Sequence, residues 1–258
     1  MNLLARTLRD RLVYQPMIDW HCHILPEIDD GADNIEESLA MAGSLREAGF
    51  SQICCTPHLM KGCYEATSSQ VRLAVAAFQE QVDAAGIDLR LHPCREYCLD
   101  EYLMDYLSDP LPILDDKRIL VEIPQRLSGE MIRQLAYRLV RSGFVPVIAH
   151  PERCHQLEPR AVGRQAGGML DRLKRLFGTV AEDELGDTLH QSGNPLLDYL
   201  RDLGCSFQGN LGSFSGFYGS HVRSVAFFMH RLGIYDRFGS DLHSPGHADA
   251  ILRSPFPN

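Results

Sequence analysis

The sequence predicts an α/β fold of parallel strands, arranged either as a barrel or as a doubly wound sheet. Short apolar runs alternate with segments of helical periodicity along most of the chain. Several of these runs are continuously apolar, which is typical of parallel strands covered on both faces. The chain has 258 residues, 45% of them hydrophobic and 23% charged, so such a fold can bury its core without disulfides.

Seven segments have the pattern of strands. Each is a short, largely apolar run bounded by turn residues or by a segment of helical period. Because helical segments separate them, consecutive strands are expected to lie parallel, with a crossover helix between neighbours. The strands are expected at residues 17–21, 51–57, 89–96, 118–123, 145–149, 205–209 and 235–241.

The segments between the strands carry recognisable helix ends. Asn34 with Glu37 resembles a capping box, and Gly49 suits the position just after a helix. A later helix begins Asn194-Pro195, a cap followed by proline at the first helical position. Helices are expected over residues 34–48, 69–84, 129–142, 195–203 and 219–232.

Two segments break this rhythm. Residues 1–16 precede the first strand, and the leucine spacing within them predicts an amphipathic helix over residues 2–13 that docks on the protein body. Residues 160–193 are rich in glycine and charge, with a helical stretch around 168–177. We interpret them as an insertion that is either a lid or a surface decoration. A single domain over residues 1–258, with this extension and this insertion, is therefore expected.

The charge balance limits the classes of partner. There are 25 Lys and Arg against 34 Asp and Glu, a net charge of −9, which does not favour nucleic acid or an anionic membrane. No apolar run approaches the roughly 18 residues of a membrane span. Arg6, Arg9 and Arg11 interrupt the N-terminus, which lacks the apolar centre of a secretory signal. We expect a cytoplasmic protein with no integral membrane segment, whose eight cysteines are reduced.

Nearly every predicted strand ends in a side chain that can bind a metal. In an α/β barrel the C-terminal ends of the strands form one mouth, so these side chains should converge there. Imidazole and carboxylate ligands suit Mn²⁺, Fe²⁺ or Zn²⁺ better than a soft metal, and their number favours two or three ions over one. The strand-end residues are Asp19, His21, His23, His58, Glu96, Glu122, His150, Asp241 and His243.

Each of these residues also has a purely structural interpretation. A single strand-end histidine is more often hydrogen-bonded than metal-bound, and Glu122 can pair with a buried arginine. Asp30 lies in an Asp-Asp-Gly sequence that forms turns. The structural interpretation, however, needs a separate explanation for every strand end. His21-x-His23 is the sharpest local signal, because a period of two points both side chains to the same face.

Six motifs follow one another in a familiar order. They are MIDWHCHILPEIDDGADNIEESLAMA from residue 17, TPH at 56–58, the Glu96 segment, VEIP at 121–124, IAHPER at 148–153 and GSDLH at 239–243. The order resembles the PHP (polymerase and histidinol phosphatase) superfamily, and more closely its bacterial tyrosine-protein phosphatase branch, which acts with capsule and exopolysaccharide systems. The opening block and AHPER are highly specific, whereas GSDLH alone is weak. The resemblance spans about residues 17–247.

The resemblance implies a distorted (β/α)7 barrel of the PHP type and up to three divalent ions, often Mn²⁺. It assigns the phosphate contact to Arg153 and makes Asp30 a metal ligand. Asp30 or a histidine of the cluster is then a candidate to assist the leaving group. Asp19 matches a residue that orients a ligand. The implied ligands are His21, His23, Asp30, His58, Glu96, Glu122, His150, Asp241 and His243.

The implied activity is hydrolysis of phosphotyrosine in proteins, in control of capsule or exopolysaccharide synthesis. The implied substrate is a tyrosine-phosphorylated bacterial kinase or polysaccharide-export protein. Divalent ions supply an activated water and stabilise phosphoryl charge, and phenolate, with an acid pKa near 10, leaves more readily than an alkoxide. Candidates to grip the tyrosine ring are Tyr64, Phe214, Phe217 and Tyr218, for which an ordinary packing role is equally open.

The chain departs from the family pattern at two places. The family usually carries an arginine a few residues after the S-D-x-H motif, whereas residues 244–247 here read Ser-Pro-Gly-His and the next arginine is Arg253. His247 is therefore a candidate phosphate contact or proton donor. Residues 93–95 replace a glycine-rich segment, which makes Arg95 a candidate substrate contact.

Other functions remain open. The same metals and barrel serve small-molecule phosphatases of the histidinol-phosphatase type and nuclease-like phosphoesterases, the latter disfavoured by the acidic charge. A binding module with a decayed site is the non-enzyme alternative. Cys154 and Arg160 have the Cys-x5-Arg spacing of cysteine-dependent phosphatases. The residues between them contain no glycine and include a proline, so we interpret this spacing as accidental.

Overall fold

The computed structural model describes residues 17–114, 117–160 and 192–252. The helix expected over residues 2–13, the helical stretch around 168–177 and Arg253 lie outside the described residues. Within these ranges, no helix combines the length and the hydropathy needed to cross a bilayer.

The described residues form two parallel sheets. One sheet holds β1 (Met17–Cys22), β2 (Phe50–Cys55) and β4 (Arg90–Pro93), in the order β1-β2-β4. The other holds, in spatial order, β3 (His58–Leu59), β5 (Glu96–Cys98), β6 (Arg118–Glu122), β7 (Val145–Ala149), β8 (Ser206–Asn210) and β9 (Arg237–Gly239). The seven expected strands are all found. The second corresponds to β2 and is continued by β3 beyond its expected end at residue 57, and the third is divided between β4 and β5.

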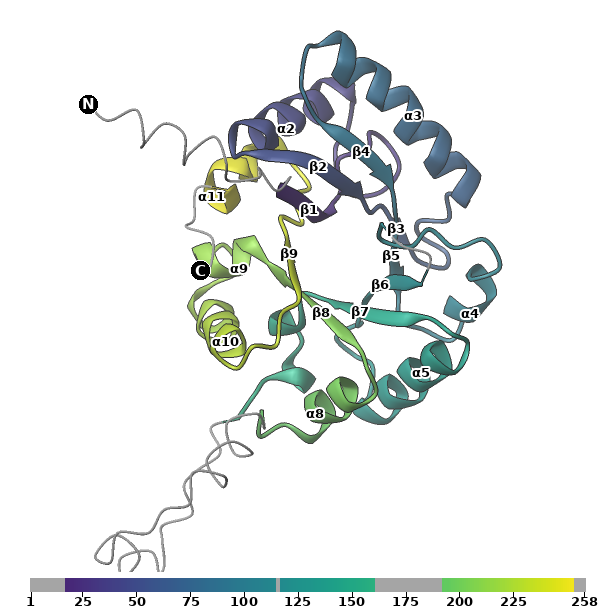
Figure 1. Cartoon of the computed structure of the whole chain (residues 1–258), viewed down its shortest axis with the longest axis vertical. Coiled ribbons are helices and arrows are strands. Elements are labelled where there is room, and N and C mark those ends of the chain that lie inside the picture. The colour runs from purple at the N-terminus through teal and green to yellow at the C-terminus, as the bar shows by residue number, and fades with distance from the viewer. Residues whose placement is uncertain (1–16, 115–116, 161–191, 253–258) are drawn as a thin grey trace, which may run out of the picture.

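Backbone hydrogen bonds connect the two sheets at both edges. At one edge, Cys94 N donates to Cys55 O (3.0 Å) and Glu96 N donates to Pro57 O (3.3 Å), which carries the pairing across the divided strands. At the other edge, Asp241 N donates to His21 O (2.7 Å), just beyond the end of β9. The strands therefore curl around one interior, with the helices on the outside (Figure 1).

The five expected helices are confirmed. They are α2 (Ile35–Glu47), α3 (Ser68–Ala84), α5 (Gly129–Arg141), α8 (Pro195–Asp202) and α10 (Ser220–Arg231). The sequence did not predict three short helices, α4 (Leu103–Tyr106), α9 (Leu211–Ser215) and α11 (Ala248–Leu252), or three 3-10 turns, η1 (Pro151–Arg153), η2 (His155–Leu157) and η3 (Pro245–His247).

The helix ends match the expected capping in part. Asn34 Oδ1 accepts from Glu37 N (2.9 Å), but the Glu37 carboxylate accepts from Asp33 N, so the expected capping box is incomplete. A complete capping box occurs instead at Thr67 and Gln70. Gly49 has φ +100°, a conformation that costs glycine little and lets the chain reverse into β2.

In the part of the chain that the structure describes, three clusters of buried residues make up the core. Two of them lie between the sheets and the helices. The third lies on the opposite face of the strands, because its members alternate along β2, β6 and β7 with residues that pack under helices. This small interior cluster consists of Cys54, Cys94, Ile113, Leu120, Val147 and Ala149.

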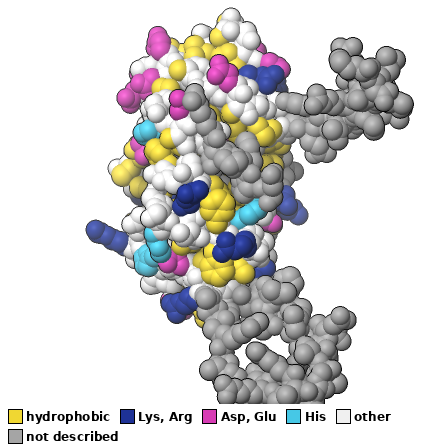
Figure 2. Space-filling view, turned by 90° about the vertical axis from the view of Figure 1, so that its left-hand side faces the viewer, with side chains coloured by type: hydrophobic (Ala, Val, Ile, Leu, Met, Phe, Trp, Pro, Cys, Tyr) yellow, Lys and Arg dark blue, Asp and Glu magenta, His cyan; other side chains and the backbone are white. Residues whose placement is uncertain are grey.

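Charge is distributed unevenly over the face formed by α9, α10 and α11. Figure 2 shows acidic side chains gathered toward one end of this face and arginine or lysine side chains beside hydrophobic ones over the rest. Two such pairs on α10 are Arg223 over the Phe227 ring (5.6 Å) and Arg231 over the Phe228 ring (5.5 Å). The negative net charge therefore does not extend evenly to this side.

Candidate metal centre

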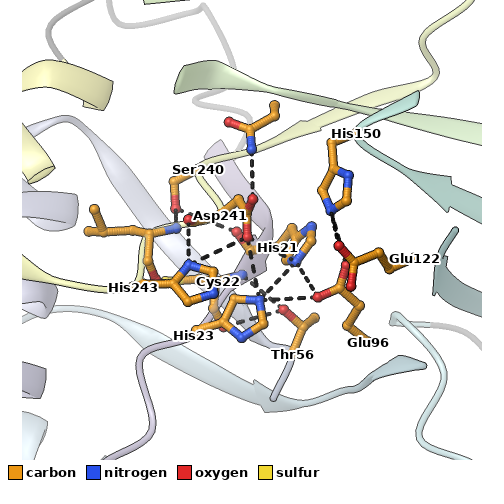
Figure 3. Close-up of polar contacts among 12 residues, drawn as sticks. His21, Cys22, His23, Thr56, Glu96, Glu122, His150, Ser240, Asp241 and His243 are labelled. Carbon is orange, nitrogen blue, oxygen red and sulfur yellow. Dashed lines mark hydrogen bonds and ion pairs between the residues drawn. The ribbon is translucent and has the colours of Figure 1, made fainter. Parts of the chain in front are cut away.

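The fold brings the predicted ligands together at one mouth, as the sequence led us to expect, although His58 and Glu96 are the first residues of β3 and β5 and do not end a strand. Figure 3 shows His21, His23, Glu96 and Asp241 pointing toward one another, with Glu122 and His150 on one side and His243 on another. The histidines and acids come from the ends of β1, β3, β5, β6 and β7, from the segment after β9 and, for Asp30, from the loop after β1.

His21 and His23 lie at the middle of this cluster. Their Nε2 atoms are 3.0 Å apart. Both atoms also face Glu96 Oε2, at 3.1 and 3.3 Å, and Asp241 Oδ1, at 3.3 and 3.4 Å. Four potential ligand atoms thus surround one small volume inside the mouth.

The other ring nitrogens of the two histidines determine what faces this volume. His21 Nδ1 is 2.8 Å from Gln208 Oε1, and His23 Nδ1 is 2.7 Å from Asp29 Oδ2. The Gln208 amide is oriented by its nitrogen, which donates to Gly209 O. Both Nδ1 atoms therefore carry the proton, so a neutral ring presents its Nε2 lone pair to the cluster. Two such lone pairs and two carboxylates repel one another unless a cation lies between them.

Glu96 has the surroundings of a shared ligand. It is fully buried, and its Oε2 atom has no hydrogen-bond donor among the described residues. The same oxygen lies 3.1 Å from His58 Nδ1 as well as near the nitrogens of His21 and His23. A buried carboxylate oxygen without an assigned donor, surrounded by imidazole nitrogens that face it with lone pairs when neutral, fits a metal ligand.

Two groups of side chains flank this middle. On one side, His150 Nε2 lies 3.2 Å from Glu96 Oε1 and 3.8 Å from Glu122 Oε1. On the other, Asp30 Oδ1 lies 3.5 Å from His58 Nε2 and 3.7 Å from His243 Nε2. Three sets have ligand atoms within 4.8 Å of one another, and these are His23, Asp30, His58 and His243; His21, His23 and Glu96; and His58, Glu96 and Glu122.

The electrostatics of the cluster favour cations. Burial alone would lower the pKa of His21, but the carboxylates of Glu96 and Asp241 raise it to about 9. Burial, and then the charge of Glu96, raises the pKa of Glu122 to about 7. The His21 shift, and the part of the Glu122 shift that comes from Glu96, reflect the carboxylate charge gathered inside the mouth. Burial together with the Arg153 charge lowers the pKa of His150 to about 4, which leaves it neutral, as a metal ligand must be.

Two of the predicted ligands have a strained backbone. His150 has φ +32° and Asp241 has φ +52°, in the left-handed region that non-glycine residues seldom adopt. Hydrogen bonds hold both residues there, from Asp241 N to His21 O and from Arg153 N to His150 O. Strain of this kind is retained mainly at functional sites, where it directs a side chain that ordinary geometry would turn away.

Arg153 lies at the edge of the cluster. Its Nη1 atom is 2.7 Å from Asp241 Oδ2, and its guanidinium covers the Tyr218 ring at 4.5 Å. The side chain is partly exposed. It can therefore reach an anion at the mouth without leaving the tyrosine ring.

Sequence reasoning missed the side chains that hold the ligands. Gln208 and Asp29 orient the two central histidines, and Asn210 Nδ2 donates to Asp241 Oδ2 (2.7 Å). Gln208 and Asn210 are two residues apart on β8 and so face the same side, a period-two signal that was readable from the sequence. Asp19 accepts from the backbone of His21 and Ser240, which agrees with the expected orienting position.

Two predicted substrate contacts are not in contact with the cluster. Arg95 is buried on the other side of its strand, where Nη2 donates to Ala66 O (2.6 Å). The reason is local, because Arg95 precedes Glu96 and consecutive side chains point to opposite faces. His247 is exposed, and its nearest aromatic neighbour is Phe217, with ring centroids 4.9 Å apart.

Phe214, a candidate to grip the tyrosine ring, does not line the mouth. It is buried against Phe227, Tyr235 and Phe238 and is an ordinary core residue.

Cys154 is also buried, and burial raises the pKa of its thiol to about 11, so it does not form the thiolate that a cysteine phosphatase needs. This supports the interpretation of its spacing to Arg160 as accidental.

Comparison with known proteins identifies similar chains. Residues 17–164 match the family model for capsular polysaccharide synthesis, CpsB/CapC. The chain is 29% identical over 231 residues to tyrosine-protein phosphatase YwqE of Bacillus subtilis, which covers 88% of this chain and 78% of YwqE. It is 32% identical over 145 residues to tyrosine-protein phosphatase CpsB of Streptococcus pneumoniae, which covers 55% of this chain and 59% of CpsB.

A solved structure extends the similarity to three dimensions. A chain from the crystal structures of YwqE and CpsB, described as unique metal-dependent tyrosine phosphatases, superposes with a TM-score of 0.69. The two chains are 27% identical, and the match covers 94% of this chain and 88% of the other.

Proposed function

Because the chain belongs to the CpsB/CapC family of capsular polysaccharide synthesis proteins, we propose that it is a metal-dependent phosphatase that hydrolyses phosphotyrosine in proteins. The relatives YwqE and CpsB are named tyrosine-protein phosphatases, and the matching crystal structures are described as metal-dependent. The single observation that carries the proposal is Glu96 Oε2, a buried acceptor without a donor that faces three imidazole nitrogens.

We propose that two or three divalent ions bind in the mouth, with Mn²⁺ as the first candidate and Fe²⁺ and Zn²⁺ as alternatives. When bound, such ions activate a water and neutralise phosphoryl oxygens. Imidazole and carboxylate ligands of mixed type suit this group of metals. The proposed ligands are His21, His23, Asp30, His58, Glu96, Glu122, His150, Asp241 and His243.

The remaining side chains bind and orient the substrate in this proposal. Arg153 holds two phosphoryl oxygens with its planar fork, and the Tyr218 ring beneath it limits its motion. Asp30, with half of its side chain exposed at the mouth, assists departure of the phenolate. Asn210 keeps one Asp241 oxygen occupied, so that the other faces the histidines.

We further propose that the fold is a distorted (β/α)7 barrel of the PHP type, formed as a single domain with an N-terminal extension and the insertion at 160–193. Counting β2 with β3 and β4 with β5 as two divided strands leaves seven positions around the interior. The hydrogen bonds at both sheet edges support this count.

The proposed substrate is a tyrosine-phosphorylated bacterial kinase or polysaccharide-export protein in the cytoplasm, and the proposed role is control of capsule or exopolysaccharide synthesis. The family description, capsular polysaccharide synthesis, supports the role, and the relatives' names as tyrosine-protein phosphatases support a phosphotyrosine substrate. A flexible tyrosine-containing tail suits a mouth whose reacting groups are buried, because a folded surface would not reach them.

The direct test combines metal analysis with an assay. We expect the purified protein to contain divalent metal, to hydrolyse a phosphotyrosine peptide, to lose this activity with EDTA and to regain it with Mn²⁺. Histidinol phosphate, assayed in parallel, should have a much lower kcat/KM. A higher kcat/KM for histidinol phosphate would favour the small-molecule phosphatase, and the absence of both metal and hydrolysis would contradict the proposal.

A further inference from the structure

An exposed aromatic pair lies beside the candidate metal centre and has no role in the reaction as described. Phe217 follows α9 and is 39% exposed. Its ring lies 4.9 Å from that of His247 in η3, which is also exposed. The two residues are distant in sequence, so the fold brings them together at this place.

Tyr218 connects this pair to the phosphate-binding arginine. The Phe217 and Tyr218 rings meet edge to face, with centroids 5.0 Å apart. The Arg153 guanidinium lies 4.5 Å from the Tyr218 ring centroid, and the Tyr218 hydroxyl lies 3.4 Å from Asp241 Oδ2. Tyr218 therefore contacts both Phe217 and Arg153 and connects them.

The backbone holds Phe217 firmly in this position. Gly216 has φ +88°, which ends α9 and turns the chain outward. Phe217 N then donates to Gly212 O (2.9 Å) and lies 3.3 Å from Ser215 Oγ. The backbone at Phe217 is thus fixed, and a phenyl ring with only two rotatable bonds loses little conformational entropy when it binds a ligand.

The chemistry of phosphotyrosine matches this arrangement. Its phenyl ring is joined to phosphorus through one oxygen, so the ring must lie close to whatever holds the phosphate. Arg153 lies 4.5 Å from the Tyr218 ring, and that ring lies 5.0 Å from Phe217, so a phenyl ring joined to a phosphate on Arg153 comes near these aromatic side chains. Aromatic pairs are favourable with centroids about 4.5–7 Å apart. Phosphoserine offers no ring and gains nothing from this contact.

We propose that Phe217 and His247 form an aromatic subsite that holds the phenyl ring of phosphotyrosine while Arg153 holds its phosphate. This inference rests on the proposed phosphatase function. It makes Phe217 a specificity-determining residue, and it assigns His247 to ring contact and not to proton transfer. Tyr64 stacks on His58, a proposed ligand, with ring centroids 5.8 Å apart, and is not part of this subsite.

The experiment compares Phe217→Leu with the wild type on a phosphotyrosine peptide, and measures inhibition by inorganic phosphate on the same proteins. We expect KM for the peptide to rise roughly 3- to 10-fold, the range that an aromatic pair contributes, while the inhibition constant of phosphate stays the same. Phe217→Trp should retain the wild-type KM. Tyr137→Leu, at an exposed tyrosine on α5, is the matched control and should change neither constant.

His247 provides a second, independent measurement. His247→Phe keeps the ring and loses the proton-transfer group, so we expect an unchanged KM and kcat, whereas His247→Ala should raise KM. An unchanged peptide KM in Phe217→Leu, or an equal loss of phosphate and peptide binding, would overturn the subsite and leave the phosphatase function intact. If wild-type protein with Mn²⁺ does not hydrolyse phosphotyrosine, the proposed function itself fails.

Discussion

The inner and outer parts of the candidate metal centre differ in how firmly their side chains are held. The inner part, defined as His21, His23, Glu96 and Asp241, is buried. Three of these four side chains have an oriented partner outside the cluster, namely Gln208, Asp29, and Arg153 with Asn210.

The outer part, defined as Asp30, His58 and His243, is more open. The exposed fractions of these three side chains are 51%, 13% and 27%. Asp30 contacts the two histidines at 3.5 and 3.7 Å. His243 stacks on His23, with centroids 3.9 Å apart, and its Nδ1 lies 2.9 Å from Asp241 O. A buried site whose ligands are oriented by hydrogen bonds binds a metal ion more tightly than an exposed site without such partners. We therefore expect the inner part to bind its ion with higher affinity than the outer part.

The largest effect is expected from removing the negative charge of Glu96, the carboxylate shared by two of the proposed ligand sets. Glu96→Gln leaves the shape but takes away the carboxylate next to His21, His23 and His58. We expect bound metal to fall and kcat/KM to drop by about 10³-fold or more, since metal-based stabilisation accounts for several kcal/mol of the barrier. Metal analysis and peptide hydrolysis measure the two effects. Glu80→Gln, on the exposed side of α3, is the matched control, and full metal content in Glu96→Gln would contradict the shared-ligand assignment.

The second prediction tests whether side chains outside the cluster raise the metal affinity of the inner part by orienting its ligands. Gln208→Leu removes the acceptor that fixes the tautomer of His21. Loss of such a partner typically lowers metal affinity 10- to 100-fold, and we expect a decrease of about this size. Titration with Mn²⁺ under competition from a chelator measures it. An affinity equal to that of the wild type would show that the inner ligands need no such support.

A smaller effect is expected in the outer part. Asp30→Asn should lower kcat about tenfold, less than a typical general acid contributes, because phenolate leaves readily. Ions bound by His21 and Glu96 should remain. Metal stoichiometry separates the two parts here: one ion fewer with the others retained supports the comparison, and complete loss of metal contradicts it.

The smallest effect is expected at Cys154, outside both parts. Its thiol is buried, and its Sγ lies 3.1 Å from Gln156 Oε1. Cys154→Ser should change kcat by about twofold or less, because the reaction we propose uses no thiolate. Near-complete loss of activity in a folded, metal-loaded variant would instead support cysteine chemistry.

Much of the fold could be predicted because its signals are local. The seven strands and five long helices follow from short apolar runs, caps and glycines such as Gly49, which act over a few residues. The continuation of the second strand into β3 and the division of the third were not predictable in the same way. Both depend on pairing across two sheets, where Glu96 N reaches Pro57 O, a contact between distant segments.

The composition of the candidate site was also readable from the chain, because strand ends in a parallel fold converge whatever the details of packing. The sequence by itself therefore determined which histidines and acids meet and which segments carry them, while the order of the strands in space came from the structure. Only the tertiary structure decided which neighbouring side chains contact and orient these ligands. Arg95 turned away, His247 paired with Phe217, and Gln208 and Asn210 supplied the supporting contacts. The physical reason is that a local period shows which side chains share a face, as for Gln208 and Asn210, whereas the partner that each one meets depends on the register between distant strands.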